Sequence, residues 1–182
     1  MPRPPLARER VLDAFEAILI DDGERAATLD AVAKAAGVSK GGLLYHFASK
    51  DDLAAGLVTR LSRLTDDDLD RMTSADESLE AYYIRTSEME DDALDRALVA
   101  TSRLAQGGSA NAAAALREVR HRWAETIRPH VRDETALDLV MLVSDGLYFN
   151  NSLGVYGERT ALTADGTLSQ LVELVVRAAE RE

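Results

Sequence analysis

Few residues of this 182-residue chain have the types and spacing that enzyme chemistry needs. There are no cysteines, which excludes thiol catalysis, disulfides and cysteine-ligated metals. The three histidines, His46, His121 and His130, have no neighbours in the pattern of a zinc site or of a nucleophile with its base and orienting group. His121 and Glu125 stand four residues apart, the spacing of an exposed pair on one helix. We therefore expect no enzyme, no metal and no cofactor.

Charge is distributed unevenly along the chain, and this leaves room for a local basic surface. The formal net charge of −11 would repel nucleic acid over a wide range. Residues 1–63, however, hold three Lys and six Arg against nine acidic residues, so the negative charge belongs to the rest of the chain. Within 38–50, Lys40, His46 and Lys50 occur without any acidic residue. The first part of the chain can therefore present cations to a polyanion.

The elements that must position these residues are helices throughout. Apolar residues recur every three or four positions, and no stretch sustains the alternation of a strand. Thr28, Ser49 and Ser109 stand where N-caps are expected, and Asp52 completes a capping-box pattern with Ser49. The sequence predicts an all-α fold, with helices at 11–19, 28–37, 39–47, 49–72, 79–89, 94–104, 116–131, 137–153 and 168–179.

Two of the short helices have the pattern of a helix-turn-helix. The first ends at Gly37, and the small residues Ala33 and Gly37 allow the next helix to approach and turn. The second helix of such a pair enters a DNA major groove. Gly41 and Gly42 each cost a helix about 1 kcal/mol relative to Ala, and in this setting they would leave space for DNA. For two glycines alone, an ordinary flexible loop is the alternative.

The string TLDAVAKAAGVSKGGLLYHFASKDDL, residues 28–53, closely resembles the N-terminal domain of the tetracycline-repressor (TetR) family of bacterial transcription regulators. The matching positions, without a gap, are Thr28, Val32, Ala33, Ala36, Gly37, Val38, Ser39, Leu43, Tyr45, His46, Phe47, Lys50 and Leu53. The resemblance covers about residues 8–57, and the rest of the chain agrees only in length and helical character. The family often has Ser or Thr where Gly42 stands, so this chain lacks a side-chain contact at that point.

The resemblance implies a domain organisation, a function and a set of DNA contacts. It implies a three-helix DNA-binding domain at 1–52 and a helical effector-binding and dimerisation domain at 53–182. The implied function is a ligand-responsive transcriptional regulator, by default a repressor that a small effector releases from its operator. A helical ligand-binding or interaction module without sequence-specific DNA binding is the alternative. The implied phosphate contacts are Thr28, Tyr45 and Lys50, and the residues close to the groove are Ser39, Lys40, Gly41, Gly42 and His46.

The two C-terminal helices carry more apolar surface than a surface helix needs. Residues 139–143 are apolar at every position, and a second broad stripe consists of Leu168, Leu171, Val172, Val175 and Val176. We expect these helices to form an interface between two copies, so that two recognition helices read a palindromic operator. Burial within a single monomer is the alternative.

Candidate ligand contacts in the C-terminal part combine aromatic residues with a carboxylate. Asp145 stands in an apolar segment, where a buried carboxylate is costly unless it is paired. Aromatic rings with one carboxylate suit a lipophilic, cationic effector. The alternatives are that Trp123 belongs to the core and that Asp145 pairs with an arginine or lies at an exposed edge. The candidates are Tyr82, Tyr83, Met89, Trp123, Met141, Asp145, Tyr148 and Asn151.

Two acidic runs, at 66–68 and 90–92, stand out in the middle of the chain. Neighbouring like charges repel each other and are best hydrated. We expect both runs to face solvent. The N-terminus has no apolar segment after its charges, and the apolar run at 139–143 is too short to cross a bilayer, so we expect a cytoplasmic protein without a membrane partner.

Overall fold

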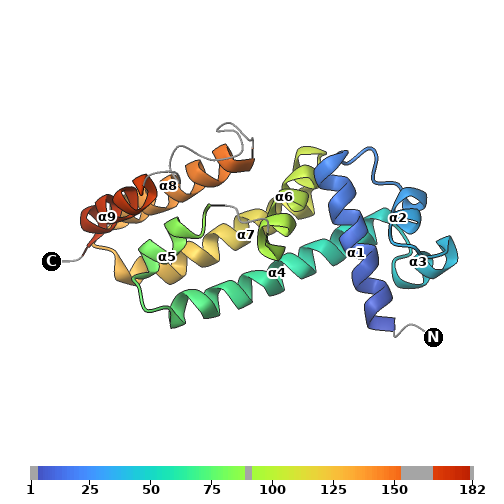
Figure 1. Cartoon of the computed structure of the whole chain (residues 1–182), viewed down its shortest axis with the longest axis horizontal. Helices are drawn as coiled ribbons and strands as arrows, with labels where there is room; N and C mark the ends of the chain where they lie inside the picture. The colour runs from blue at the N-terminus through green and yellow to red at the C-terminus, as the bar shows by residue number, and fades with distance from the viewer. Residues whose placement is uncertain (1–3, 89–91, 153–165, 181–182) are drawn as a thin grey trace. The chain divides into compact units, whose positions relative to one another are not determined.

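The computed structural model describes residues 4–88, 92–152 and 166–180, and all regular structure in these ranges is helical (Figure 1). This confirms the predicted all-α class. The α-helices are α1 (Pro4–Asp21), α2 (Leu29–Ala35), α3 (Lys40–His46), α4 (Lys50–Ser74), α5 (Leu79–Arg85), α6 (Ala93–Gln106), α7 (Ala110–Ile127), α8 (Glu134–Ser152) and α9 (Thr167–Ala179). A short 3-10 helix, η1 (Arg128–His130), follows α7. In the same ranges, no helix combines the length and apolarity that a bilayer crossing requires.

The helix ends follow from side-chain caps, three of which, Thr28, Ser49 and Ser109, the sequence predicts. The Thr28 hydroxyl accepts a hydrogen bond from the Ala31 backbone N–H at 3.2 Å and starts α2, while Gly37, at φ +65°, ends the segment. The Ser49 hydroxyl accepts from the Asp52 N–H at 3.1 Å and donates to the Asp52 carboxylate at 3.0 Å. The predicted capping pair therefore forms, with a hydrogen bond between the Ser49 and Asp52 side chains.

Several predicted helix limits differ from the observed ones. The helix expected at 79–89 ends at Arg85, where the hydroxyls of Thr86 and Ser87 donate to the carbonyls of Tyr82 and Tyr83 at 2.9 and 2.7 Å. The Ser87 backbone N–H donates to the Ile84 carbonyl instead of that of Tyr83, so the helical pattern stops. The helix that carries the apolar residues from 116 onward begins at Ala110, where the Ser109 hydroxyl accepts from the Ala112 N–H as the predicted cap and the alanines that follow favour helix.

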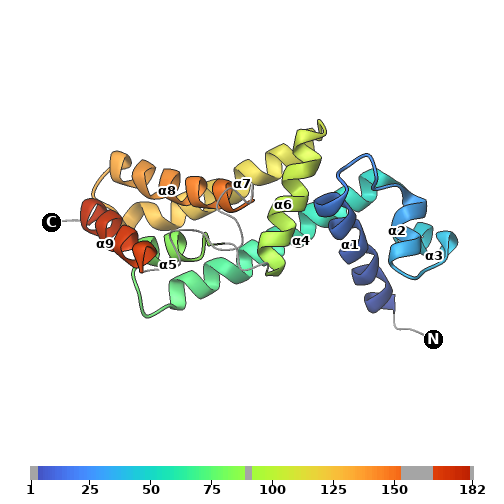
Figure 2. The same cartoon turned by 45° about the horizontal axis from the view of Figure 1, so that its top comes forward.

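The chain forms two compact units, which are described separately here. The first unit comprises residues 1–65 and 91–119, and the second comprises 66–90 and 120–182. The first unit thus holds α1, α2, α3 and α6 with the beginnings of α4 and α7 (Figure 2).

The core of the first unit forms where α1 contacts α2, α3 and α6. Gly56 of α4 belongs to this core for steric reasons, since a Cβ there would lie 2.8 Å from Cε1 of Phe47 and 3.1 Å from Cδ2 of Leu12. Phe47 is the C-cap of α3, so the end of α3 packs against α4 at Gly56. The fully or almost fully buried apolar residues are Val11, Leu12, Phe15, Leu19, Val32, Leu43, Phe47, Leu53, Leu57 and Leu61.

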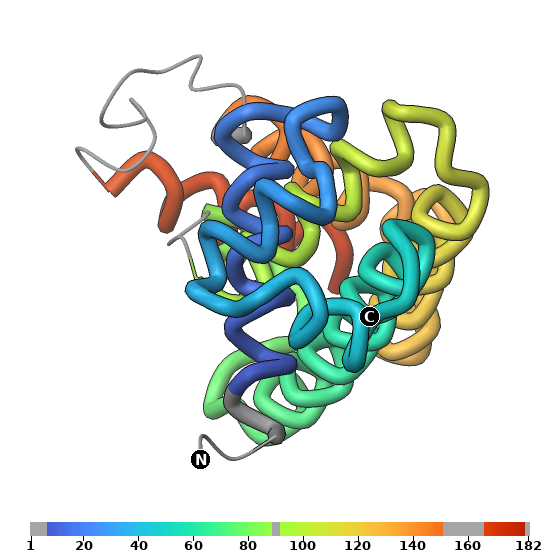
Figure 3. Tube along the Cα trace, turned by 90° about the vertical axis from the view of Figure 1, so that its right-hand side faces the viewer, coloured from blue at the N-terminus to red at the C-terminus, as the bar shows by residue number. Residues whose placement is uncertain are grey.

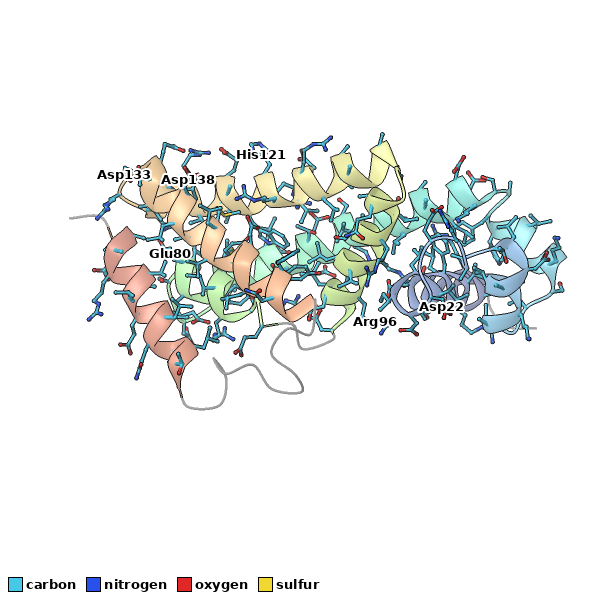
Figure 4. All side chains as sticks on the ribbon, turned by 90° about the horizontal axis from the view of Figure 1, so that it is seen from above. Asp22, Glu80, Arg96, His121, Asp133 and Asp138 are labelled. Carbon is cyan, nitrogen blue, oxygen red and sulfur yellow. The ribbon has the colours of Figure 1, made fainter. Side chains whose placement is uncertain are left out.

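A network of ion pairs links α1, α4 and α6 beside this core. The Arg60 side chain, only 11% exposed, lies 2.7 Å from Glu9, 2.8 Å from Asp13 and 3.4 Å from Glu16. Glu16 is buried and also accepts from Nε of Arg96 at 3.2 Å (Figure 4 labels Arg96 on α6). Burial raises the pKa of Glu16, and the positive charge of Arg60 opposes that rise. The network ties α6 to the first helices of the chain.

The second unit packs α5 against α8 and α9. The Arg132 backbone N–H, just after η1, donates to the carbonyl of Ala179 at 3.0 Å and ties this segment to the last residue of α9. Trp123 packs against the core of the unit without being fully buried in it. The core includes Met72, Tyr82, Tyr83, Ile84, Ile127, Val131, Leu137, Val140, Met141, Leu147, Leu168 and Val175.

Candidate functional site

Helix α3 has one buried face and one exposed face. Figure 3 views the first unit from the side on which α3 lies. The Ser39 hydroxyl caps the helix by accepting from the Gly42 N–H at 3.0 Å, a role that adds to the groove position expected of Ser39. Leu43 is fully buried, whereas Tyr45 is 83% exposed. The Tyr45 ring lies edge-on to His46, with centroids 5.1 Å apart. An aromatic ring this exposed makes little contribution to the core.

Gly41 and Gly42 lie in the first turn of α3. A Cβ at Gly41 would meet nothing within 4 Å, and one at Gly42 would lie 3.2 Å from the Ser39 hydroxyl oxygen. Neither glycine has the positive φ that favours glycine over other residues. The backbone therefore does not require glycine at Gly41, and the described protein leaves the space in front of it open.

Both lysines that the sequence singled out form ion pairs. Lys40 Nζ lies 2.9 Å from the Asp30 carboxylate, and both side chains are exposed. Lys50 Nζ lies 2.9 Å from the Glu24 carboxylate and donates to the Glu24 carbonyl at 2.7 Å. No spacing rule predicts either pair, because their members stand on different elements.

The structure brings the eight predicted DNA-contact residues to one part of the first unit. They stand at the caps of α2 and α3, on α3 itself and at the start of α4, and none is buried. We call them the α3 surface: Thr28, Ser39, Lys40, Gly41, Gly42, Tyr45, His46 and Lys50.

A carboxylate in the second unit joins three aromatic residues, and its position was not predicted. Asp68 is 6% exposed, so the expectation that the run at 66–68 faces solvent is wrong for this residue. Its two oxygens accept from the Tyr82 hydroxyl at 3.1 Å and from Nε1 of Trp123 at 2.9 Å. The Tyr83 ring lies against Trp123, with centroids 5.5 Å apart. We call these four residues the Asp68 cluster.

The helical spacing could have identified Asp68. It stands four residues after Leu64 and four before Met72, on the apolar face of α4 that both residues mark. Burial raises the pKa of Tyr82 to about 12, with the nearby Asp68 charge adding to the rise. Burial likewise raises the pKa of Tyr83. The Tyr82 phenol therefore stays a neutral hydrogen-bond donor to Asp68 well into the alkaline range.

The other predicted ligand contacts have varied positions. Asp145 is not a buried carboxylate, because its side chain is 44% exposed and accepts from Nε of Arg120 at 2.9 Å. This is the arginine pairing that the sequence left open. Met141 is buried and Tyr148 is half-buried on α8. Met89 and the side chain of Asn151 lie outside the described residues.

The pair of His121 and Glu125 has the form predicted for it. The His121 Nδ1 and the Glu125 carboxylate are 3.9 Å apart, and both side chains are well exposed on α7 (Figure 4). Within the described ranges no three His, Asp or Glu side chains are grouped as metal ligands would be.

The fold and the α3 surface define the chain as a helix-turn-helix regulator, and comparison with known families gives the same class. The family model described as bacterial regulatory proteins, tetR family, matches residues 11–57. The model described as tetracyclin repressor-like, C-terminal domain, matches residues 77–175. The chain belongs to the TetR family of bacterial regulatory proteins. It is a DNA-binding transcriptional regulator and not an enzyme.

Solved structures with the same fold cover almost the whole chain. GusR of Salmonella enterica is 18% identical, with a TM-score of 0.69 and 98% of each chain covered. A transcriptional regulator from Saccharomonospora viridis in complex with choline is 18% identical, with a TM-score of 0.68 and 97% of this chain and 98% of that chain covered. SmeT in complex with triclosan is 23% identical, with a TM-score of 0.63 and coverages of 97% and 92%. At these identities the likeness shows the fold. No curated protein matches the chain.

Proposed function

We propose that the chain is a repressor that binds operator DNA through the α3 surface and leaves it when a small effector binds. The observation that carries this proposal is that neither the backbone conformation nor the packing of the protein requires glycine at Gly41. A bare backbone in the first turn of a recognition helix allows the closest approach to bases and phosphates. In this proposal the DNA-binding domain is 1–52, and the effector-binding and dimerisation domain is 53–182.

The residues of the α3 surface have distinct roles in the proposed complex. Thr28, Tyr45 and Lys50 contact phosphates, because hydroxyl and ammonium groups at helix ends fix the register on the duplex. Lys40 faces the groove, where a lysine can bond guanine O6 and N7. Ser39, Gly41, Gly42 and His46 line the same approach.

A dimer supplies the second recognition helix that a palindromic operator requires. Family members act as dimers, and α8 and α9 expose large apolar side chains among the described residues. Leu142 is the most exposed of them at 65%. Exposed apolar area of this kind marks an interface between copies. The side chains are Leu139, Leu142 and Phe149 on α8 and Leu174 on α9.

The effector in this proposal is a lipophilic cation held at the Asp68 cluster. Aromatic faces attract cations, and the Arg85 guanidinium already lies 5.5 Å from the centroid of the Tyr82 ring. The buried Asp68 carboxylate provides the opposite charge, and an effector cation would compete there with Arg71, 3.7 Å away. The choline bound by the Saccharomonospora viridis regulator supports a cationic ligand. Met141, Asp145 and Tyr148 of α8 stay candidate contacts beside the cluster, together with Met89 and Asn151. To release DNA, the effector must bind the DNA-incompetent arrangement more tightly than the competent one.

The effector proposal is tested through Trp123, the single tryptophan of the chain. Benzyltrimethylammonium titrated against Trp123 fluorescence should change the emission of the wild type and bind more weakly to Asp68→Asn. The matched control is Asp70→Asn, which removes the same charge from an exposed position on the same helix. Equal binding to both variants, or preference for neutral and anionic compounds such as triclosan, would refute a cation site at Asp68.

The DNA-binding proposal is tested by selecting bound fragments from genomic DNA with the purified full chain. We expect a palindromic duplex to be enriched, with two half-sites separated by about one helical turn or a multiple of it. Compounds that bind the chain should then release it from the selected duplex. A chain that prefers no double-stranded fragment at low ionic strength would contradict the proposal.

A further inference from the structure

Both lysines of the α3 surface are held by carboxylates of the same unit. Lys40 on α3 lies 2.9 Å from Asp30 on α2, and Lys50 on α4 lies 2.9 Å from Glu24 in the segment between α1 and α2. Each ammonium group that is expected to face DNA thus has a negative partner of its own.

Gly107 lies next to the Glu24 carboxylate. A Cβ at Gly107 would lie 2.7 Å from Oε2 and 3.1 Å from Cδ of Glu24. Gly107 has φ −73°, which any residue adopts, so the backbone does not require glycine there. The bare Cα leaves room for the Glu24 carboxylate, whose other oxygen faces Lys50. Glu24 therefore lies between Lys50 and Gly107 in the first unit.

These pairs contribute little to the stability of the fold. Asp30 and Lys40 are exposed, and about a third of the Glu24 and Lys50 side chains is exposed. Ion pairs at such positions have small net effects because water screens them. Their effect on DNA binding is larger, because sequence-independent binding depends almost entirely on attraction between cations and phosphates. A duplex that approaches the α3 surface meets two neutral pairs in place of two free cations.

We infer that Glu24 and Asp30 are internal counter-ions that lower the affinity of the α3 surface for DNA. The inference rests on the DNA contacts proposed for Lys40 and Lys50. In a loose complex the phosphates stay hydrated, and the lysines keep their carboxylate partners. In the operator complex, base contacts hold the duplex at hydrogen-bonding distance, so phosphate and guanine replace the carboxylates. The operator complex therefore loses the free energy of both ion pairs, and the two acids weaken operator binding at least as much as loose binding.

The test measures binding of Glu24→Gln and Asp30→Asn to a mixed-sequence duplex about three helical turns long, by fluorescence anisotropy over a range of NaCl concentrations. Each variant should bind this duplex roughly two- to fivefold more tightly than the wild type, the range expected when a surface ion pair is released. The slope of log K against log salt should steepen by about 0.9 for each freed lysine. The operator duplex selected from genomic DNA should gain at least as much, because its complex breaks each ion pair.

The matched control is Asp138→Asn, which changes the net charge equally from an exposed position on α8 (Figure 4). It should leave the affinity for the mixed-sequence duplex unchanged. In a Lys50→Ala background, Glu24→Gln should lose its effect, because the two residues act as a pair. Gly107→Ala displaces the Glu24 carboxylate without changing charge, and it should also strengthen binding to the mixed-sequence duplex.

Two outcomes separate this inference from the proposed function. In the first outcome, the wild type binds the selected duplex, but Glu24→Gln and Asp30→Asn gain no more affinity for the mixed-sequence duplex than Asp138→Asn does. This result overturns the inference and leaves the proposed regulator function intact. The inference is also overturned if Glu24→Gln has the same effect with and without Lys50. If the wild type binds no duplex, the proposed function itself fails.

Discussion

Substituting Gly56 by alanine should destabilise the first unit, although the same substitution normally stabilises a helix. Gly56 lies inside α4, where Ala is favoured over Gly by about 1 kcal/mol. Its Cβ, however, would lie 2.8 Å from Cε1 of Phe47 and 3.1 Å from Cδ2 of Leu12, closer than van der Waals contact allows. Both neighbours are buried, so the added methyl must move Phe47 or part α4 from α1. Overpacking of this kind costs about 1 to 3 kcal/mol.

The net effect of Gly56→Ala on the free energy of unfolding is therefore a loss of roughly 1 kcal/mol, within a range of about 0 to 2. Urea unfolding followed by circular dichroism measures it, with wild type and variant compared at equal slope. Gly146→Ala on α8 is the matched control, because a Cβ there meets nothing within 4 Å. That variant should gain up to about 1 kcal/mol. A Gly56→Ala protein more stable than the wild type would refute the packing argument.

Three further predictions concern DNA contacts, ionisation and assembly. Lys50→Ala should weaken binding to the selected operator duplex and reduce its slope of log K against log salt by about 0.9, so an unchanged slope would remove Lys50 from the phosphate contacts. The pKa of Tyr82 is raised from 10.0 to about 12, so the stability that its neutral phenol contributes is fully present below pH 10 and is lost as pH rises toward 12. In an alkaline titration followed by absorbance, Tyr82→Phe should lack the phenol that ionises late in the wild type. A Tyr82 phenol that ionises near its ordinary pKa would contradict the burial argument. Leu142→Glu should shift the sedimenting species toward the monomer, whereas a wild type that is monomeric at all concentrations would exclude the dimer.

Local sequence patterns predicted the fold because helix periodicity and capping depend on neighbouring residues. Thr28, Ser49 and Gly37 act at the predicted helix ends since each makes its contact within a few positions. The α5 boundary was missed because Thr86 and Ser87 bond back to carbonyls, and single-residue propensity does not reveal this competition.

The missed site residues make contacts that join distant parts of the sequence. Glu24 lies 26 residues before Lys50, and Gly107 meets it from another helix, so no spacing rule connects the three. Asp68 was assigned to solvent because it stands in an acidic run, although its place on the apolar stripe of α4 indicated burial. The charge of a segment is a weaker guide to burial than the position of each residue on its helix face.

Binding of Gly41→Leu to the selected operator duplex tests the central claim most directly. The free protein has room for the new side chain, since a Cβ at Gly41 meets nothing within 4 Å, and leucine favours helix. We predict that this variant folds at least as stably as the wild type, in thermal and urea unfolding, and loses operator binding because the leucine occupies the space of the DNA. A stable Gly41→Leu protein that binds the operator as tightly as the wild type would show that α3 does not approach the duplex through its glycines.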